Sequence, residues 1–414
     1  MRMLPPVLYF LKWLAITLII GALAGSASAF FLVALDRVTA YRETHERLIF
    51  LLPLAGLFIG LLYHYFGNGI AKGNNLVIEE IHRPSRIVPL VMAPFILFST
   101  LVTHLFGGSA GREGTAVQIG GALADQFSRW FGVAHRDRHI LLICGISAGF
   151  ASVFGTPLAG TVFALEVFLL GSMRYQALFP ALLSAIFADQ ACRLWGVGHT
   201  TYPVAAVPAI NIALLGWTAA AGIIFGLAAR FFSVLNHWLG ARFSRHIGYP
   251  PLRPLAGGLL IVSLLLIAGT RYAGLGIPVI VESFTRVQPP ETFGWKILLT
   301  CLTLGAGFKG GEVTPLFFIG AALGSCLSAV MPLPVSLLAA MGFAAVFAAA
   351  ANTPLACILM GVELFGSGPA VYVAVACVLA YLVSGQRGIY SAQQQKDFKT
   401  GLWNDVSAGA NTTP

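Results

Sequence analysis

Long stretches without a charged side chain dominate this sequence and limit what it can fold into. Five runs lack Asp, Glu, Lys and Arg altogether: Leu14–Leu35, Ile49–Phe66, Ile87–Phe106, Ile210–Ala229 and Val371–Val383. Several approach the roughly 20 residues that an α-helix needs to cross a bilayer. Only 10% of the residues are charged, against about 25% in soluble domains. We therefore predict an all-α, polytopic membrane protein.

Glycine and proline interrupt many of these apolar stretches. The chain holds 46 glycines and 22 prolines, and several apolar stretches are too short or too broken to span a bilayer simply. Irregular backbone at membrane depth is tolerated only where protein buries it or where it lines a cavity. Transporters build their ion sites from such discontinuous helices. The interruptions therefore predict broken helices around a polar path.

Two motifs occur twice, in the same order. "TPLAGTVFALEVF" at Thr156–Phe168 matches "TPLACILMGVELF" at Thr353–Phe365, 197 residues later. "GREGTAVQIGGAL" at Gly111–Leu123 matches "GEVTPLFFIGAAL" at Gly311–Leu323, 200 residues later. Two pairs at nearly one offset indicate that the chain consists of two homologous halves.

This repetition predicts three segments. Residues 1–205 form a first transmembrane repeat, residues 206–390 form a second, and residues 391–414 form a short polar tail without a regulatory domain. The residues alone are compatible with parallel and with inverted repeats. In either case, transporter repeats place the substrate site near the midplane, at their interface.

Four glycine-flanked segments carry the polar residues that such a site needs. They are "KGNNLVIEE" at Lys72–Glu80, "GREGTAVQIG" at Gly111–Gly120, "FKGGEVTPLFFIG" at Phe308–Gly320 and "QRGIYSA" at Gln386–Ala392. In the first three, glycine precedes a run that can start a helix. A helix N-terminus presents free N–H groups and about half a positive charge, which favour an anion. Several converging N-termini would hold an anion without binding it too tightly for transport.

Together these motifs resemble the CLC family of anion channels and transporters over nearly the whole chain. "GREG", the two repeats that contain "PL", "GLGIP" at Gly274–Pro278 and "GIYSA" occur in the family's order. The resemblance implies a CLC-type fold with two inverted repeats of broken, tilted helices. It also implies a homodimer with one pore per subunit.

The resemblance assigns roles to individual residues. Glu113 stands at the family's gating glutamate, whose carboxylate mimics an anion when ionised and carries a proton when protonated. An ionisable residue at membrane depth is a functional candidate in any case. Tyr390 stands at the central tyrosine whose hydroxyl faces the anion. We interpret Arg112 as electrostatic support for the site.

Several positions depart from the chloride-transporting members of the family. Asn74 replaces a serine that donates to the anion, and Asn75 replaces the glycine that follows it. Thr115 replaces the proline after "GREG". Val167 stands where chloride/proton exchangers carry an inner glutamate. In the third segment "EVTP" replaces an "IFAP"-like stretch, at Glu312, Val313 and Thr314.

These departures resemble the fluoride-exporting branch of the family, CLC-F. Fluoride is small and strongly hydrated, so stripping its water needs dense, strong hydrogen-bond donors. An asparagine amide supplies two N–H donors where serine supplies one hydroxyl. For gating and proton transfer we predict Glu113 and Glu312. The predicted anion-binding residues are Asn74, Asn75, Gly111, Arg112, Gly114, Thr115, Val313, Thr314 and Tyr390.

We predict a fluoride/proton antiporter that exports fluoride across the inner membrane of a prokaryote. Its expected partners are fluoride, with chloride as the alternative anion, protons and the lipid bilayer; we expect no nucleic acid, cofactor or metal. A chloride/proton exchanger or a passive chloride channel of the same family is the nearest alternative. An intramembrane enzyme or an organic-solute permease is more remote. A hydrolase would need a Ser–His, Asp–Asp or metal-bound His set. The sequence has no HExxH motif and no paired Asp in a span, so we do not expect an enzyme.

The remaining acidic residues in apolar surroundings are predicted to be structural. We expect Glu79, Glu80, Glu166, Glu282 and Glu363 to cap helices or to pair with arginines. Glu166 and Glu363 occupy equivalent positions in the two repeats, which favours structure over chemistry.

Overall fold

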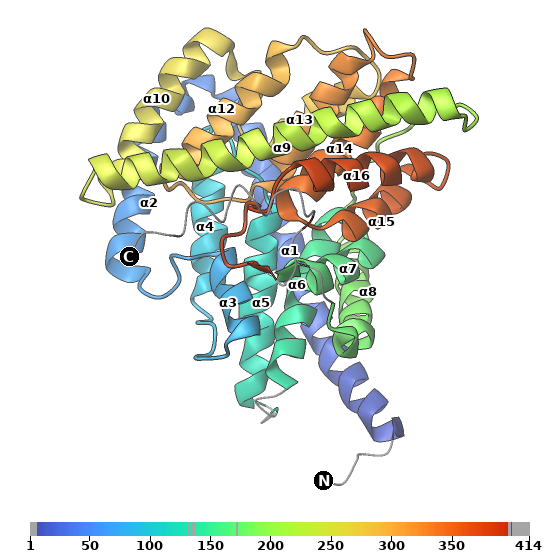
Figure 1. The fold of residues 1–414 in the computed structure, drawn as a ribbon. Coiled ribbons are helices and arrows are strands. Elements are labelled where there is room, and N and C mark those ends of the chain that lie inside the picture. The colour runs from blue at the N-terminus through green and yellow to red at the C-terminus, as the bar shows by residue number, and fades with distance from the viewer. Residues whose placement is uncertain (1–5, 131–132, 134–136, 171–172, 396–398, 400–414) are drawn as a thin grey trace, which may run out of the picture.

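The computed structural model describes residues 6–130, 133, 137–170, 173–395 and 399, and this part of the chain is almost entirely helical (Figure 1). Residues 396–398 and 400–414 of the predicted tail lie outside it. The first eight helices are α1 (Pro6–Thr44), α2 (Leu52–Phe66), α3 (Asn74–His82), α4 (Met92–Leu105), α5 (Glu113–Trp130), α6 (Arg138–Phe154), α7 (Pro157–Glu166) and α8 (Leu178–Leu194). The next eight are α9 (Ile212–His246), α10 (Leu252–Ala268), α11 (Ile277–Ser283), α12 (Glu291–Gly305), α13 (Val313–Leu327), α14 (Val335–Ala351), α15 (Pro354–Phe365) and α16 (Ala370–Val383).

Short elements connect these helices. Three 3₁₀ turns are η1 (Glu46–Leu51), η3 (Tyr175–Ala177) and η4 (Thr270–Tyr272). Two short strands, β1 (Leu169–Leu170) and β2 (Gln394–Gln395), pair in parallel. This pairing fixes the chain after α16 to the segment after α7. The predicted all-α architecture is therefore confirmed, with this small exception.

Among the residues that the structure describes, four helical segments are long and apolar enough to cross a membrane: Val7–Thr44, Glu46–Phe66, Tyr175–Leu194 and Ile212–His246. Eight shorter apolar helices accompany them. With 39 residues, α1 is about 58 Å long, which exceeds the roughly 30 Å of hydrocarbon in a bilayer. A helix of this length has to tilt or to project from the membrane. In Figure 1, α9 runs across the molecule between α5–α8 on one side and α10 and α12 on the other.

The repeated sequence folds into repeated local structure. Gly155 directly follows α6 and Asn352 directly follows α14, both in the left-handed conformation with φ of 70° and 58°. A left-handed residue after a helix closes its last turn, and glycine and asparagine accept that conformation best. Pro157 and Pro354 then start α7 and α15, where a proline lacks only an N–H group that would be free anyway.

Small residues let the paired helices of each half approach closely. α5 packs on α6, and α13 packs on α14. A Cβ atom on Gly120 would clash with the carbonyl of Gly145, and one on Gly320 would clash with the carbonyl of Gly342. Small residues at such crossings allow close helix packing in membranes. The α5–α6 and α13–α14 pairs are thus tightly packed, and they hold in place the loops that precede α5 and α13.

Two glutamates cap each other's helices. Glu363, near the end of α15, accepts hydrogen bonds from the N–H groups of Leu158 (2.9 Å) and Ala159 (2.8 Å) at the start of α7. Glu166, at the end of α7, accepts from the first turn of α15 at 3.2 and 3.0 Å. Each carboxylate satisfies N–H groups that have no partner within their own helix. The predicted capping role of both residues is confirmed.

A buried ion-pair network fixes α3. Arg138 of α6 donates to Asp125 of α5 (2.7 Å) and to Glu80 of α3 (3.1 Å), and all three side chains are at most 6% exposed. Glu80 also accepts hydrogen bonds from the Ser85 hydroxyl and backbone N–H. A buried ion pair is stable only when such additional bonds satisfy its charges. This network holds the helix that begins at Asn74.

The other two acidic residues lie at the surface. Glu282 pairs with Arg271 (3.2 Å), as predicted. Glu79 pairs with Lys72 (2.7 Å), so its partner is a lysine and not the predicted arginine.

The reciprocal caps lead to a prediction about stability. Replacing Glu363 by alanine leaves two N–H groups of α7 without a partner, and we expect a loss of about 1–3 kcal/mol of unfolding free energy. The same change at Glu166 should have a similar effect, because its two bonds are equivalent. The midpoint of thermal unfolding in detergent measures this loss. Glu79→Ala is the matched control and should be nearly neutral, because its pair with Lys72 is exposed.

Candidate functional site

The backbones that precede α5 and α13 are bonded to each other. The N–H of Gly111 donates to the carbonyl of Gly311 (2.6 Å), and the N–H of Gly311 donates to that of Gly111 (2.8 Å). This antiparallel bridge joins residues that are equivalent in the two sequence repeats. The N-termini of two helices therefore meet inside the protein, as the sequence motifs predicted. Converging N-termini favour negative charge.

The Glu113 carboxylate lies at the N-terminus of α13. It accepts a hydrogen bond from the backbone N–H of Thr314 (3.0 Å) and from the Thr314 hydroxyl (2.6 and 2.7 Å to its two oxygens). The backbone N–H of Arg112 donates to it at 3.2 Å, and the Arg112 Nε lies 3.6 Å away. Glu113 is fully buried. Its carboxylate thus receives the charge-assisted bonds that a bound anion would receive.

Asn74, on a third helix, lies against Gly114 at the start of α5. α3 begins directly after Gly73, which has a φ of 58°. The Asn74 Nδ2 lies 2.8 Å from where a Cβ atom on Gly114 would be, so only glycine leaves room for the amide there. The Asn74 Oδ1 is buried without a hydrogen-bond partner among the residues described. The side chain is therefore held beside the start of α5.

A cavity of about 240 Å³, which we call the inner cavity, reaches Asn74 at the start of α3. Asn74, Asn75, Glu312 and Tyr390 line it, although they come from three distant parts of the sequence. The Glu312 Oε2 is buried without a hydrogen-bond partner within the described part of the chain. Val313 starts α13 and is 1% exposed, and its side chain carries no hydrogen-bond donor. The inner cavity thus brings two carboxamides, a carboxylate and a phenol to one space.

Two predicted anion donors have other partners in this structure, and a third residue, Asn75, is bonded through its acceptor oxygen. The Gly111 N–H is bonded to Gly311. The Thr115 hydroxyl forms a hydrogen bond with the Thr100 hydroxyl at 2.7 Å. The Asn75 Oδ1 accepts from the backbone N–H of Ala392 at 3.0 Å, so Asn75 fixes the segment that follows Tyr390. Of the two threonines, Thr314 is the one whose hydroxyl reaches the Glu113 carboxylate.

Several residues of the inner cavity are not among the predicted site residues. Lys309, Gln118 and Tyr63 are three of them. Lys309 directly precedes the glycines of "GGEVTP", and Gln118 lies one helical turn after Gly114. A lysine at the edge of an apolar run is a signal that could have identified the first of them.

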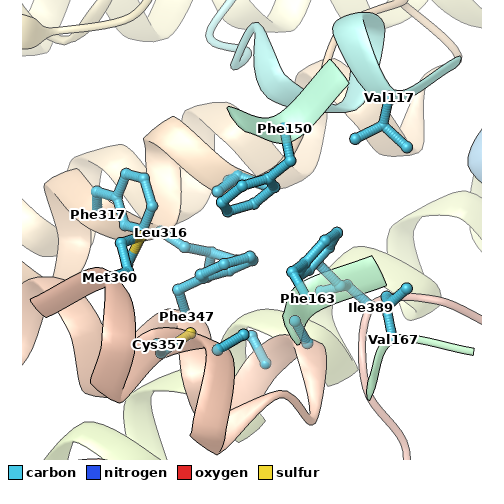
Figure 2. Packing of buried hydrophobic residues seen from close by; sticks show 14 of the residues in the cluster. Val117, Phe150, Phe163, Val167, Leu316, Phe317, Phe347, Cys357, Met360 and Ile389 are labelled. Carbon is cyan, nitrogen blue, oxygen red and sulfur yellow. The ribbon is translucent and has the colours of Figure 1, made fainter. Parts of the chain in front are cut away.

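Aromatic packing fills the region around Val167. Val167 is 2% exposed and belongs to a cluster that includes Phe150, Phe163, Phe347 and Ile389 (Figure 2). The rings of Phe150 and Phe163 are stacked at 4.4 Å between centroids. The Val167 side chain is therefore part of this apolar cluster.

The chain also contains two Gly-x-Ser-x-Gly sequences, a pattern found in serine hydrolases, at residues 107–111 and 145–149. Ser109 in the first shares a hydrogen bond with the Thr300 hydroxyl (2.8 Å). Ser147 in the second donates to the carbonyl of Ala181 (2.9 Å). Both nitrogens of nearby His104 contact backbone carbonyls. Within the described part of the chain, neither serine therefore has the histidine partner that a nucleophile needs.

Comparison with known proteins identifies the family. The sequence profile of the family described as "Voltage gated chloride channel" matches residues 55–385. The "Chloride/fluoride channel protein" of Pseudomonas syringae pv. tomato is 53% identical over 393 residues, which cover 93% of this chain and 87% of that relative.

Solved structures lead to the same family. A structure described as "a CLC-type fluoride/proton antiporter" superposes with a TM-score of 0.92 at 35% identity, over 95% of this chain and all of that one. A "slow cyanobacterial Cl-/H+ antiporter" superposes with a TM-score of 0.78 at 20% identity, over 99% of this chain and all of that one, which shows the shared fold. The predicted CLC-type fold is confirmed, and the chain belongs to the voltage gated chloride channel family, CLC.

Proposed function

We propose that the protein is a fluoride/proton antiporter that exports fluoride. The observation that carries this proposal is the position of Glu113, whose buried carboxylate accepts hydrogen bonds from the N–H and the hydroxyl of Thr314. A carboxylate held in this way competes with a free anion for the same donors. The likeness to a structure described as a CLC-type fluoride/proton antiporter, at 35% identity and a TM-score of 0.92, supports the same substrates.

The exchange follows from the charge of one side chain. Ionised, Glu113 occupies the N-terminus of α13 and closes the path. Protonated, it loses the attraction to these donors, leaves the site and carries its proton with it. Fluoride then takes the donors that the carboxylate has left, namely the Thr314 N–H and hydroxyl. Anion binding and proton binding at Glu113 are therefore mutually linked.

The donor set supports fluoride over chloride. Fluoride is the stronger hydrogen-bond acceptor and the more strongly hydrated ion, so it needs strong donors in place of its water. The Thr314 hydroxyl already contacts the site, and the Asn74 amide lies beside the start of α5. Glu312, with an oxygen free of hydrogen bonds in the described structure, is the candidate for exchanging the proton with the inner cavity.

We also propose the assembly and the location that the family resemblance implies. These are a homodimer with one pore per subunit, in the inner membrane of a prokaryote. The two halves, residues 1–205 and 206–390, would act as inverted repeats around the site, which the reciprocal caps of α7 and α15 support. A chloride/proton exchanger of the same family is the alternative. The aromatic packing around Val167 argues against it, since the inner carboxylate is replaced there.

Replacing Glu113 by glutamine tests the exchange. Glutamine neither mimics an anion nor carries a proton, so we expect coupled exchange to be abolished. Fluoride efflux and proton uptake should be recorded together in proteoliposomes. Coupled exchange at the original rate in Glu113→Gln would contradict the assignment. Equal fluoride and chloride rates in the wild type would refute fluoride selectivity.

The two threonines allow a matched test of the donor set. Thr314→Val keeps the side-chain shape but removes the hydroxyl that contacts Glu113, and we expect fluoride transport to fall about tenfold. Thr115→Val removes a hydroxyl that bonds only to Thr100 among the residues described, so it should retain most of the transport rate. Equal losses in both variants would show that the hydroxyls act only through packing.

Neighbouring asparagines provide a test of selectivity. Asn74→Ser replaces two N–H donors by one hydroxyl, and we expect the fluoride-to-chloride rate ratio to fall about tenfold. Asn75→Ser changes the adjacent residue, whose Oδ1 fixes the segment after Tyr390 through Ala392, so it should lower the rates for both anions alike and leave that ratio largely unchanged. Both ratios are measured as initial efflux rates from the same liposome preparation. An unaltered ratio in Asn74→Ser would exclude its side chain as the selectivity determinant.

A further inference from the structure

The inner cavity has a larger neighbour. A second cavity of about 510 Å³, which we call the outer cavity, lies between the end of α2 and the start of α10. His64, Asn68 and Arg253 are among the residues that line it. Tyr63, Ala71 and Lys309 line both cavities. The large side chains of Tyr63 and Lys309 therefore lie between the outer cavity and the space that Asn74, Glu312 and Tyr390 line.

Lys309 is a cation without a carboxylate partner. Among the residues that the structure describes, it forms no ion pair within 4.0 Å. Its ammonium lies over the ring of Tyr63, 4.2 Å from the centroid. The Tyr63 ring is itself fixed edge-on against Phe95, with centroids 5.9 Å apart. An aromatic face holds an ammonium group in place but leaves its charge uncompensated.

Lys72 provides an internal comparison. It also lines the inner cavity, but its ammonium donates to both oxygens of Glu79, at 2.9 and 2.7 Å. Its side chain is 61% exposed, so water screens what charge remains. Two lysines thus line one cavity, and only Lys309 presents a positive charge that no described carboxylate neutralises.

A cation between the two cavities lowers the free energy that an anion needs to move from one cavity to the other. Bringing a strongly hydrated anion from a wide space into a narrow one removes part of its water, which is unfavourable unless opposite charge replaces it. Positive groups that line a cleft also raise the local concentration of anions. Arg253, in the wall of the outer cavity, adds to this field.

We propose that Lys309 and Tyr63 form a neck through which the transported anion passes between the outer and the inner cavity. Lys309 binds the anion in transit by moving its ammonium from the Tyr63 ring to the anion. The identity of this anion as fluoride rests on the proposed function. The position of the neck rests on the two cavities and on the cation–ring contact, and it holds for any small anion that uses this path.

The first experiment measures anion affinity. In proteoliposomes, Lys309→Gln should raise the half-saturating fluoride concentration about tenfold and leave the maximal rate within about twofold. Lys72→Gln, the matched control, should leave the half-saturating concentration within about twofold, because its charge is already paired. A half-saturating concentration that is the same in wild type and Lys309→Gln would overturn the proposal.

The second experiment separates charge from packing, and it covers the case in which Lys309→Gln is unstable. Lys309→Cys should lose affinity and regain it when an aminoethyl methanethiosulfonate reagent restores a positive charge. The negatively charged sulfonatoethyl reagent should lower transport further. Wild type is the control for the six native cysteines, of which five are buried. If both reagents have the same effect, Lys309 has only a packing role.

A chloride series separates this proposal from the proposed function. If the wild type moves chloride and no fluoride, the fluoride assignment fails, and the same variants are then measured against chloride. A rise of the half-saturating chloride concentration in Lys309→Gln still supports the neck. An unchanged value overturns it, whichever anion the protein transports.

Discussion

The bridge between Gly111 and Gly311 is the contact on which the functional site depends. Two hydrogen bonds join the backbones just before α5 and α13, so the N-terminal ends of both helices meet inside the protein. Their partial positive charges repel each other unless a negative group lies between them. The Glu113 carboxylate supplies that group in the present conformation. The fold therefore creates a place that has to hold an anion or its substitute.

Tight packing keeps this arrangement rigid while one side chain moves. Glycine crossings hold α5 against α6 and α13 against α14, and the Arg138 network holds α3. A Cβ atom at Gly114 would displace the Asn74 amide. Donors fixed in this way need no rearrangement when an anion arrives, which is how a preorganised site compensates for lost hydration.

Features that depend on the backbone pattern, such as helix starts and caps, could be predicted from the sequence. Features that depend on the direction of a side chain could be predicted less well. The glycine before each helix and the repeated motifs predicted the meeting of α5 and α13, and the equivalence of Glu166 and Glu363 predicted their capping role. Thr115 and Thr314 looked alike as donors, yet Thr115 bonds to Thr100 on α4, a contact between separate helices that no local pattern encodes. The hydrogen bond between Asn75 and Ala392 was not predicted for the same reason. Lys309 was overlooked because its cavity forms only when α2, α3 and the start of α13 come together.

The reciprocal caps have a consequence for how the chain is made. α7 leaves the ribosome 197 residues before its partner motif, which at ordinary synthesis rates is roughly 10–40 s. During that interval its first N–H groups lack the Glu363 carboxylate that bonds them in the finished protein. Such groups are unfavourable in hydrocarbon. This helix end must therefore stay in water, at a lipid headgroup or within the insertion machinery until the second half has been synthesised. The first half thus completes its hydrogen bonds only after the second half is in place.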